Sequence, residues 1–341
     1  MSDFRFSTGF DEVWRPPVRS RKVRPESVLK AGAPQGEMRA KLARVAKRTP
    51  EVMVKVTGRT RGLQHLQAHL EYIMRRGELE AEGREGWPVL GEHEVRELAR
   101  DWEAAAAFDG RRGARTPTSH SIVLSMPAQT DPLVLRDAAR AFAAETFAER
   151  HDFVFVLHTD AGHPHVHLAV RSLGDNGERL NPKKADLEAW RQTFARCLRE
   201  RGIEAEATPR RARGVTRKPE RTAVRKLRER LGADGRPRVV VGAYKEAAQA
   251  AFGKVEAKPW DIATARRQAQ TRARYLAEAR LLMASTDEAD RALGREVEAF
   301  VRGMPQPDTQ RLALARELRA ANERAGTARQ GQDKPPPGRS R

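Results

Sequence analysis

Four of the chain's nine histidines fall within ten residues, at His158, His163, His165 and His167. Side chains alternate along a β-strand, so His165 and His167 share one side of the strand predicted at Val166–Val170, and His163 joins them if that strand begins earlier. His158 ends the preceding predicted strand and would lie across the hairpin as a further ligand. Three neutral imidazoles leave coordination positions open, as a catalytic metal requires. The spacing predicts a site for one divalent ion, with zinc or manganese favoured over magnesium by imidazole chemistry.

Asp160 lies two residues after His158, in the turn between the two strands. Its carboxylate could simply cap the Asp-Ala-Gly turn. It could instead orient a ligand imidazole or accept a proton during a reaction. The sequence leaves both roles open.

Tyr72, one of only three tyrosines, lies on the polar side of a predicted helix. At 100° per residue it points away from the apolar stripe that would pack this helix. Arg75 and Arg76 follow within one turn, and a guanidinium suits phosphate through its planar fork. A phenol beside these arginines and a divalent ion could attack a phosphodiester, provided that a base or the ion helps to form the phenolate. The stripe consists of Leu63, Leu66, Leu70 and Ile73.

The elements that must position these residues follow an α+β pattern. Strands are predicted at 52–56, 119–125, 153–157 and 166–170, and helices at 61–75, 92–108, 131–149 and 184–200. We expect Thr57-Gly58 to end the first strand, and Asp131-Pro132 is a typical start for the third helix. The last two strands are a hairpin apart, which makes them antiparallel. One mixed sheet with helices on a face would bury the apolar strands.

The chain has 341 residues and a net charge of +19, from 65 Lys and Arg against 46 Asp and Glu. Residues 1–50 carry +7 and residues 209–230 carry +8, so most of the excess lies in two short segments. Such segments indicate an anionic partner, either a polyphosphate or an anionic membrane surface. The length suggests about two folded units.

We expect four regions along the chain. These are a mobile basic arm over 1–49 with a short helix at 36–47, a folded domain over 50–208, a basic and mainly helical region over 209–325, and a disordered Pro/Arg tail over 326–341. Helix breaks are expected at 232–237 and 304–307.

The single cysteine, Cys197, excludes an internal disulfide and fits a reducing compartment as a buried thiol. We find no signal peptide and no membrane-spanning run, and expect a cytoplasmic protein without membrane insertion.

These motifs resemble those of plasmid relaxases, the mobilisation nucleases of the HUH endonuclease superfamily, and especially relaxases of the T-DNA border-nicking type. Leu70–Gly77 matches their first motif, with the nucleophile at Tyr72. Ser121–Pro127 resembles the second, in which Phe is commoner than Met126. The third, His-x-Asp-x-x-x-x-His-x-His, is complete. The similarity covers roughly Val52–Arg230.

The resemblance implies an HUH-type core with a central, mainly antiparallel sheet and flanking helices, followed by the helical C-terminal region. It implies His158, His165 and His167 as metal ligands, with His163 as a neighbour, and magnesium or manganese as the metal in use. Arg171 departs from the family, which usually has Asn after the histidine strand.

The activity that the resemblance implies is a metal-dependent transesterification. Tyr72, with Asp160 assisting, would attack one phosphodiester of single-stranded DNA at a plasmid transfer origin, remain on the 5′ phosphate and leave a free 3′ hydroxyl. The implied partners are this DNA, accessory relaxosome proteins and a type IV secretion coupling protein.

Two alternatives remain at this level. Rolling-circle replication initiators share the superfamily but usually carry the histidines before the tyrosine, which is the reverse of the order here. A non-catalytic DNA-binding relaxosome component would need neither Tyr72 nor the ligands.

The basic segment could contact phosphates beside the nick or form an ordinary solvated helix face. Its candidate DNA-binding residues, beyond Arg75 and Arg76, are Arg210, Arg211, Arg213, Arg217 and Lys218.

Overall fold

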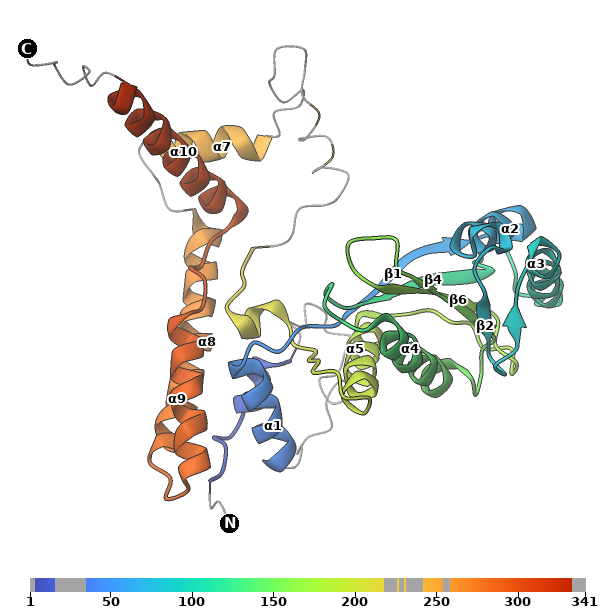
Figure 1. Cartoon of the computed structure of the whole chain (residues 1–341), viewed down its shortest axis with the longest axis horizontal. Helices are drawn as coiled ribbons and strands as arrows, with labels where there is room; N and C mark the ends of the chain where they lie inside the picture. The colour runs from blue at the N-terminus through green and yellow to red at the C-terminus, as the bar shows by residue number, and fades with distance from the viewer. Residues whose placement is uncertain are drawn as a thin grey trace, which may run out of the picture. The chain divides into compact units, whose positions relative to one another are not determined.

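The computed structural model describes residues 4–15, 35–217, 226, 230, 242–253 and 258–332 (Figure 1). The chain divides into two compact units. We call Trp14–Thr208 the sheet unit, and Met1–Val13 together with Pro209–Arg341 the helical unit.

A single sheet in the order β1-β4-β6-β5-β2-β3 forms the centre of the sheet unit. Every neighbouring pair of these strands is antiparallel, so the expected α+β class with a mainly antiparallel sheet is confirmed, whereas a mixed sheet is wrong. The two shortest strands, β2 and β3, were not predicted, because two or three residues carry no readable period. The strands are β1 (Met53–Thr60), β2 (Ala81–Gly83), β3 (Pro88–Val89), β4 (Ser119–Ser125), β5 (Phe153–His158) and β6 (His165–Arg171).

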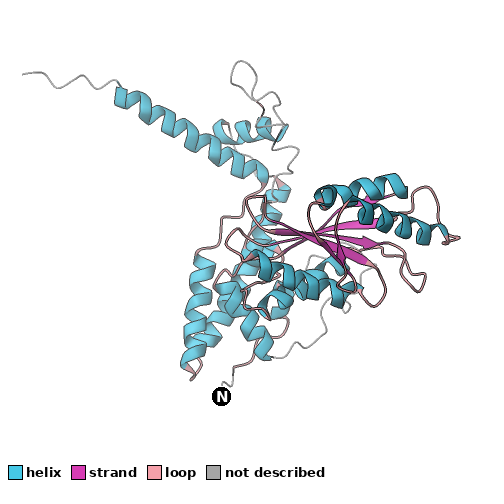
Figure 2. Cartoon of the chain, turned by 45° about the vertical axis from the view of Figure 1, so that its right-hand side comes forward, coloured by secondary structure: helices cyan, strands magenta, loops and turns pink. Residues whose placement is uncertain are grey.

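Helices cover both faces of this sheet, rather than the one face expected (Figure 2). Helices α2 (Gly62–Ile73) and α3 (Glu92–Ala107) pack on one face. Helices α4 (Pro132–Phe147) and α5 (Lys184–Arg199) pack on the other. The double cover explains the unbroken apolar run of β5, whose alternate residues enter the two separate cores.

Of two predicted element boundaries, the end of β1 differs in the structure and the start of α4 agrees. Strand β1 continues to Thr60 instead of ending at Thr57-Gly58, because a register shift between Val56 and Gly58 absorbs the irregularity as a bulge. Asp131 caps α4 as predicted, and its carboxylate accepts from the amides of Leu133 and Val134 at 2.8 and 3.1 Å.

Helix α1 (Gln35–Ala46) belongs to the sheet unit, which differs from the mobile arm expected over 1–49. Leu42 and Val45 are buried, and Arg44 pairs with Glu206 at 2.8 Å, so this part of the arm has apolar and ionic anchors that its composition did not reveal. Residues 16–34 lie outside the described part of the chain.

In the helical unit, α8 (Pro259–Met283) and α9 (Glu288–Arg302) lie side by side (Figure 1). Helix α7 (Gly242–Phe252) packs on α10 (Gln310–Gln332). The expected break at 304–307 falls between α9 and α10, whereas the one at 232–237 lies outside the described residues. Helix α10 extends into the expected disordered tail as far as residue 332, and 333–341 are not described.

None of the helices in the described residues is both long and apolar enough to cross a membrane.

Candidate functional site

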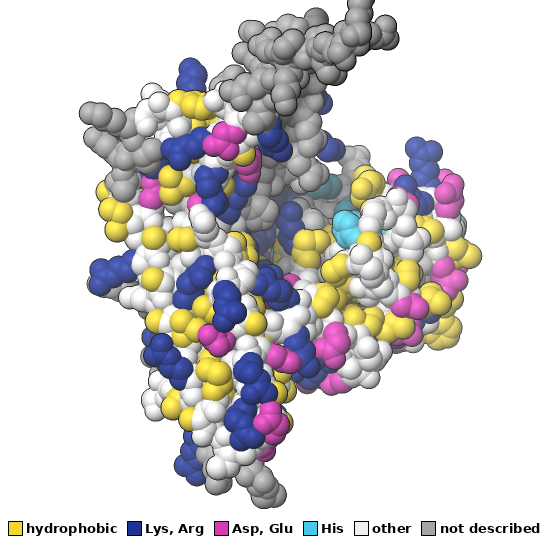
Figure 3. All heavy atoms as spheres, turned by 60° about the vertical axis from the view of Figure 1, so that its left-hand side comes forward, with side chains coloured by type: hydrophobic (Ala, Val, Ile, Leu, Met, Phe, Trp, Pro, Cys, Tyr) yellow, Lys and Arg dark blue, Asp and Glu magenta, His cyan; other side chains and the backbone are white. Residues whose placement is uncertain are grey.

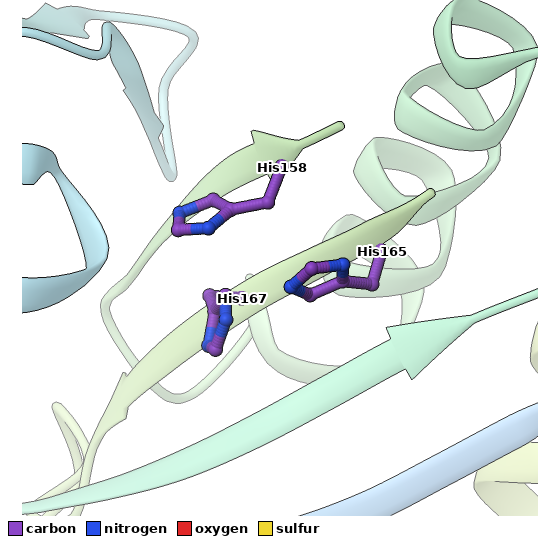
Figure 4. A group of neighbouring side chains, drawn as sticks. All are labelled: His158, His165 and His167. Atoms are coloured by element: carbon purple, nitrogen blue, oxygen red, sulfur yellow. The ribbon is translucent and has the colours of Figure 1, made fainter. Parts of the chain in front are cut away.

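The three histidines of the third motif converge on one face of the sheet (Figure 4). His158 ends β5, and His165 and His167 lie on β6 beside it. The strand register pairs His158 with His165 and Val156 with His167. All three rings therefore lie on the same face of the sheet as Val156, which is the face that packs against α2 and α3.

The cluster is compact enough to hold a metal ion. Ring nitrogens of His158, His165 and His167 all lie within 4.8 Å of one another. The ring centroids are 5.3 Å apart for His158 and His165, 4.6 Å for His158 and His167, and 5.0 Å for His165 and His167. Histidine side chains reach the molecular surface in Figure 3, where they are cyan.

Backbone carbonyls fix the protonation of two of these rings. A carbonyl oxygen can only accept a hydrogen bond, so His158 donates from Nε2 to the carbonyl of Ile73 at 2.6 Å, and His165 donates from Nδ1 to that of His163 at 3.3 Å. The opposite nitrogens, Nδ1 of His158 and Nε2 of His165, are left as the ligand atoms. His167 differs, because its Nδ1 is buried without a hydrogen-bond partner among the described residues.

Burial favours the neutral form of His165 and His167. Desolvation, followed by the neighbouring His158 and His165, lowers the pKa of His167 to about 4. Desolvation also lowers the pKa of His165 below its ordinary value. A neutral imidazole is the form that binds a metal ion. The donor set, its protonation and the orphaned nitrogen of His167 thus fit one divalent cation.

Tyr72 lies beside this cluster. It occupies the last turn of α2, whose other side buries Leu66, Leu70 and Ile73, and its side chain is 68% exposed. The Tyr72 ring stands edge-on to that of His167, with centroids 6.2 Å apart and an interplanar angle of 89°. A phenol accessible to a large substrate therefore lies next to a candidate metal ligand.

A strained turn follows Tyr72. Arg75 and Arg76 both adopt left-handed backbone conformations, with φ of 51° and 57°. Gly77 has φ +87°, and a Cβ there would come within 2.4 Å of the backbone carbon of Gly91. Glycine is therefore required by both its dihedral angle and its close approach to the neighbouring chain. The turn presents two exposed guanidinium groups at the end of α2.

Asp160 is anchored by the first of these arginines. Arg75 donates to Oδ2 of Asp160, and Oδ1 of the same carboxylate lies 3.8 Å from Nδ1 of His158. Desolvation acts to raise the pKa of the Asp160 carboxyl, but a backbone hydrogen bond and the charge of Arg75 outweigh it and hold the pKa below its usual value. Arg76 has no side-chain partner within the part of the chain that the structure describes.

His163 is outside the ligand set. Its side chain is exposed, its ring centroid is 5.9 Å from that of His165, and it contributes its carbonyl oxygen to the orientation of His165. The departure at Arg171 has a local explanation, because this side chain donates to the carbonyl of Leu173 at 3.0 Å and pairs with Asp175.

The basic residues predicted to bind DNA beyond Pro209 belong to the helical unit. Arg211 donates to the carbonyl of Glu12 at 2.8 Å, and Arg217 pairs with Glu317 at 2.9 Å. Arg210 donates to the carbonyl of Arg217 at 3.1 Å. Arg213 lies in the short helix η4 (Arg210–Arg213), and Lys218 lies outside the described residues.

Sequence reasoning overlooked His69. It lies one turn before Tyr72 on α2 and forms a 2.9 Å hydrogen bond with Ser121 Oγ, an atom of the second motif. The signal was available as the spacing of His65, His69 and Tyr72, which places all three on the polar face of the helix.

Part of this chain is similar to known DNA nucleases. Residues 72–203 match the family model described as "Relaxase: MobA/VirD2-like, nuclease domain". The chain is 29% identical over 204 residues to the T-DNA border endonuclease VirD2 of Rhizobium radiobacter, covering 54% of this chain and 47% of that protein. It is also 29% identical over 188 residues to VirD2 of Agrobacterium fabrum, covering 50% and 42%. The chain thus spans about half the length of these curated relatives.

A solved structure described as "Molecular Basis of Vancomycin Resistance Transfer in Staphylococcus aureus" matches 47% of this chain and 99% of its own, at 12% identity and a TM-score of 0.33.

Proposed function

We propose that this chain, a relaxase with a MobA/VirD2-like nuclease domain at residues 72–203, nicks one strand of transfer-origin DNA by metal-dependent transesterification. The observation that carries the proposal is the placement of Tyr72 against His167 of the three-histidine cluster. A candidate nucleophile and a candidate metal site from distant parts of the chain thus lie together on one face of the sheet.

In the proposed reaction, the Tyr72 phenolate oxygen attacks a phosphorus atom of the bound strand. A bond forms between the tyrosine oxygen and phosphorus while the bond to the 3′ oxygen breaks, leaving a 5′ phosphotyrosine and a free 3′ hydroxyl. No water is consumed, so the phosphoester energy is retained in the tyrosine link and the strand can be rejoined. The link is an example of covalent catalysis, which divides one displacement into two.

The proton balance assigns a role to Asp160. The phenol must lose one proton and the 3′ oxygen must gain one. Asp160 is ionised at neutral pH and is held beside His158, so in our assignment it takes the phenol proton and then passes that proton to the leaving 3′ oxygen, which returns Asp160 to its ionised form. Arg75 keeps the carboxylate in place, and Arg76 remains available for a phosphate oxygen.

His158, His165 and His167 would hold the metal ion. Such an ion would act as a Lewis acid that polarises the phosphoryl oxygens. Members of the family are expected to use magnesium or manganese, whereas an all-imidazole donor set also suits zinc.

The substrate and partners are further parts of the proposal. The net charge of +19 supports binding to a polyanion, and an exposed tyrosine supports a strand whose backbone can reach the ring. Transfer-origin DNA, single-stranded at the nick, accessory relaxosome proteins and a type IV secretion coupling protein are the partners we expect.

The test is covalent capture from a pool of single-stranded oligonucleotides with a randomised centre. The full chain is incubated with the pool and Mn²⁺ and denatured in detergent, and the DNA that stays attached is sequenced. We expect one enriched nick site whose adduct depends on the metal and is lost in Tyr72→Phe, although this variant still binds the selected oligonucleotide.

Tyr244→Phe is the matched control, because Tyr244 is an exposed tyrosine of the helical unit, whereas Tyr275 is fully buried. Binding without any adduct in the wild type would favour a non-catalytic DNA-binding component. An adduct that survives in Tyr72→Phe would reject the assigned nucleophile.

A further inference from the structure

A hydrogen-bonded chain of three side chains connects α2 to two strands of the sheet. His69 Nε2 lies 2.9 Å from Ser121 Oγ, and Ser121 Oγ lies 2.9 Å from Thr57 Oγ1. Thr57 Oγ1 also donates to the carbonyl of Ser121 at 3.3 Å. The network ties His69 on α2 to β4 and β1.

The three hydrogen bonds favour one assignment of donors and acceptors. If His69 donates from Nε2 to Ser121, then Ser121 donates to Thr57, and Thr57 donates to the Ser121 carbonyl, so each donor has an acceptor. In this arrangement the Nδ1 atom of His69 carries a lone pair. That atom is buried and has no partner within the described part of the chain. A buried acceptor without a donor is costly.

His167 also has a buried ring nitrogen without a partner among the described residues, and there the missing partner would be an acceptor. Of the three candidate ligands, His158 and His165 each donate a ring proton to a backbone carbonyl, but Nδ1 of His167 is buried without a partner among the described residues. If His167 binds the metal through Nε2, its Nδ1 carries a proton that requires an acceptor. Ligating histidines almost always have such an outer partner.

We propose that His69 is this outer partner, accepting the Nδ1 proton of His167 through its own Nδ1 when the metal is bound. Val123 of β4 pairs with His167 of β6, so Ser121, which holds His69, lies diagonally across from His167 on the same face of the sheet. A single contact would satisfy both orphaned nitrogens and complete a chain from His167 through His69 and Ser121 to Thr57. The inference rests on the metal centre of the proposed function, and it makes His69 a positioning residue.

The position of His69 also relates Tyr72 to the histidine cluster. A helical side chain leans over the turn that precedes it, so Tyr72 covers the part of α2 that carries His69. Fixing His69 against Ser121 would therefore hold the turn of α2 next to Tyr72, as well as the orientation of His167.

The first test measures metal affinity without DNA, by calorimetric titration of the full chain with Mn²⁺. His69→Leu removes the acceptor and is expected to weaken the Kd about 10- to 100-fold, the usual effect of losing an outer partner. His69→Asn keeps an acceptor near the position of Nδ1 and is expected to recover most of the affinity. His93→Gln, at an exposed histidine of α3, is the matched control and should bind as the wild type does.

An unchanged Mn²⁺ affinity in folded His69→Leu would overturn the inference, as would equal losses in the Leu and Asn variants. If His69→Leu does not fold, the wild type itself provides the answer through long-range proton–nitrogen NMR spectra recorded with Mg²⁺ or Zn²⁺. We expect His69 to be protonated at Nε2 and His167 at Nδ1. Protonation of His69 at Nδ1 would reject the proposal.

These measurements separate the inference from the proposed function. Weaker metal binding in His69→Leu together with a wild type that forms no DNA adduct would support the outer partner and reject the nicking activity. DNA nicking with unaltered metal affinity in His69→Leu would do the reverse. A wild type that binds no Mn²⁺, Mg²⁺ or Zn²⁺ would remove the basis of both.

Discussion

His163 lies in the loop two residues before β6, and its place outside the histidine cluster distinguishes two ligand sets. The geometry places His158, His165 and His167 together, while the His163 side chain is exposed. His165→Ala or His167→Ala should therefore abolish Mn²⁺ uptake and adduct formation, because each removes a ligand. His163→Ala should retain much of both, because the carbonyl that His163 offers to His165 Nδ1 belongs to the backbone and is kept in the variant.

Calorimetric titration of the three variants would check this prediction. A loss at His163 equal to that at His165 would shift the ligand set to the alternate residues His163, His165 and His167. Chelation of the wild type with EDTA should abolish the adduct, and added Mn²⁺ should restore it.

At the scale of elements, the turn after α2 depends on two glycine backbones in contact. A methyl group on Gly77 would overlap the backbone of Gly91 and would be added at a positive φ. We expect Gly77→Ala to lower the free energy of unfolding by about 3 kcal/mol, since overpacking and left-handed strain act together. It should also reduce adduct formation, because the same turn carries Arg75.

Urea unfolding measures the change, with Gly110→Ala as the control. A Cβ at Gly110 meets nothing within 4 Å, so this variant should remain within about 0.5 kcal/mol of the wild type. Equal stabilities for the two variants would show that the turn adapts to a side chain.

Strand β4 also carries His120, which lies on the face of the sheet opposite to Ser121. Burial, followed by the charges of Arg59 and His151, lowers the pKa of His120 from 6.5 to about 4. Between these values the unfolded chain binds a proton that the folded chain excludes. The corresponding stability is fully present above about pH 6.5 and is lost as the pH falls toward 4, amounting to about 3 kcal/mol at most.

His120→Asn keeps an acceptor for the hydroxyl of Ser172, which lies 3.0 Å from His120 Nδ1. The loss of unfolding free energy between pH 7.5 and 4.5, measured in urea with EDTA present, should be smaller in this variant than in the wild type. Identical losses would mean that His120 is not the group that takes up the proton.

At the scale of the whole molecule, the excess positive charge should set affinity rather than chemistry. Each phosphate contact on single-stranded DNA contributes about −0.7 to the slope of log affinity against log salt. Neutral replacements in the basic segment should flatten this slope and weaken binding to many sequences alike, while a saturating short oligonucleotide is still cut. The replaced residues are Arg210, Arg211, Arg213, Arg217 and Lys218.

The control removes five exposed charges from other helices of the same unit. An unchanged slope in the first variant would assign the basic segment to solubility or to a protein partner. The ion pair of Arg217 with Glu317 makes a folding check by circular dichroism necessary for that variant. The control residues are Arg266, Arg267, Arg280, Arg295 and Arg302.

Features that depend on near neighbours in the chain could be predicted from the amino-acid sequence. The α+β order, the Asp131 cap and the polar placement of Tyr72 follow from periodicity and capping, which act over a few residues. The hairpin spacing also allowed His158, His165 and His167 to be placed together, because only six residues separate the two strands.

Contacts between distant segments of the chain became known from the folded structure alone. The ion pair of Arg75 with Asp160 joins residues 85 positions apart, and the His69 contact with Ser121 spans 52. The second helical cover of the sheet and the anchoring of α1 arise in the same way. Local pattern cannot specify such contacts, because it fixes which face of an element is apolar but not which partner buries it.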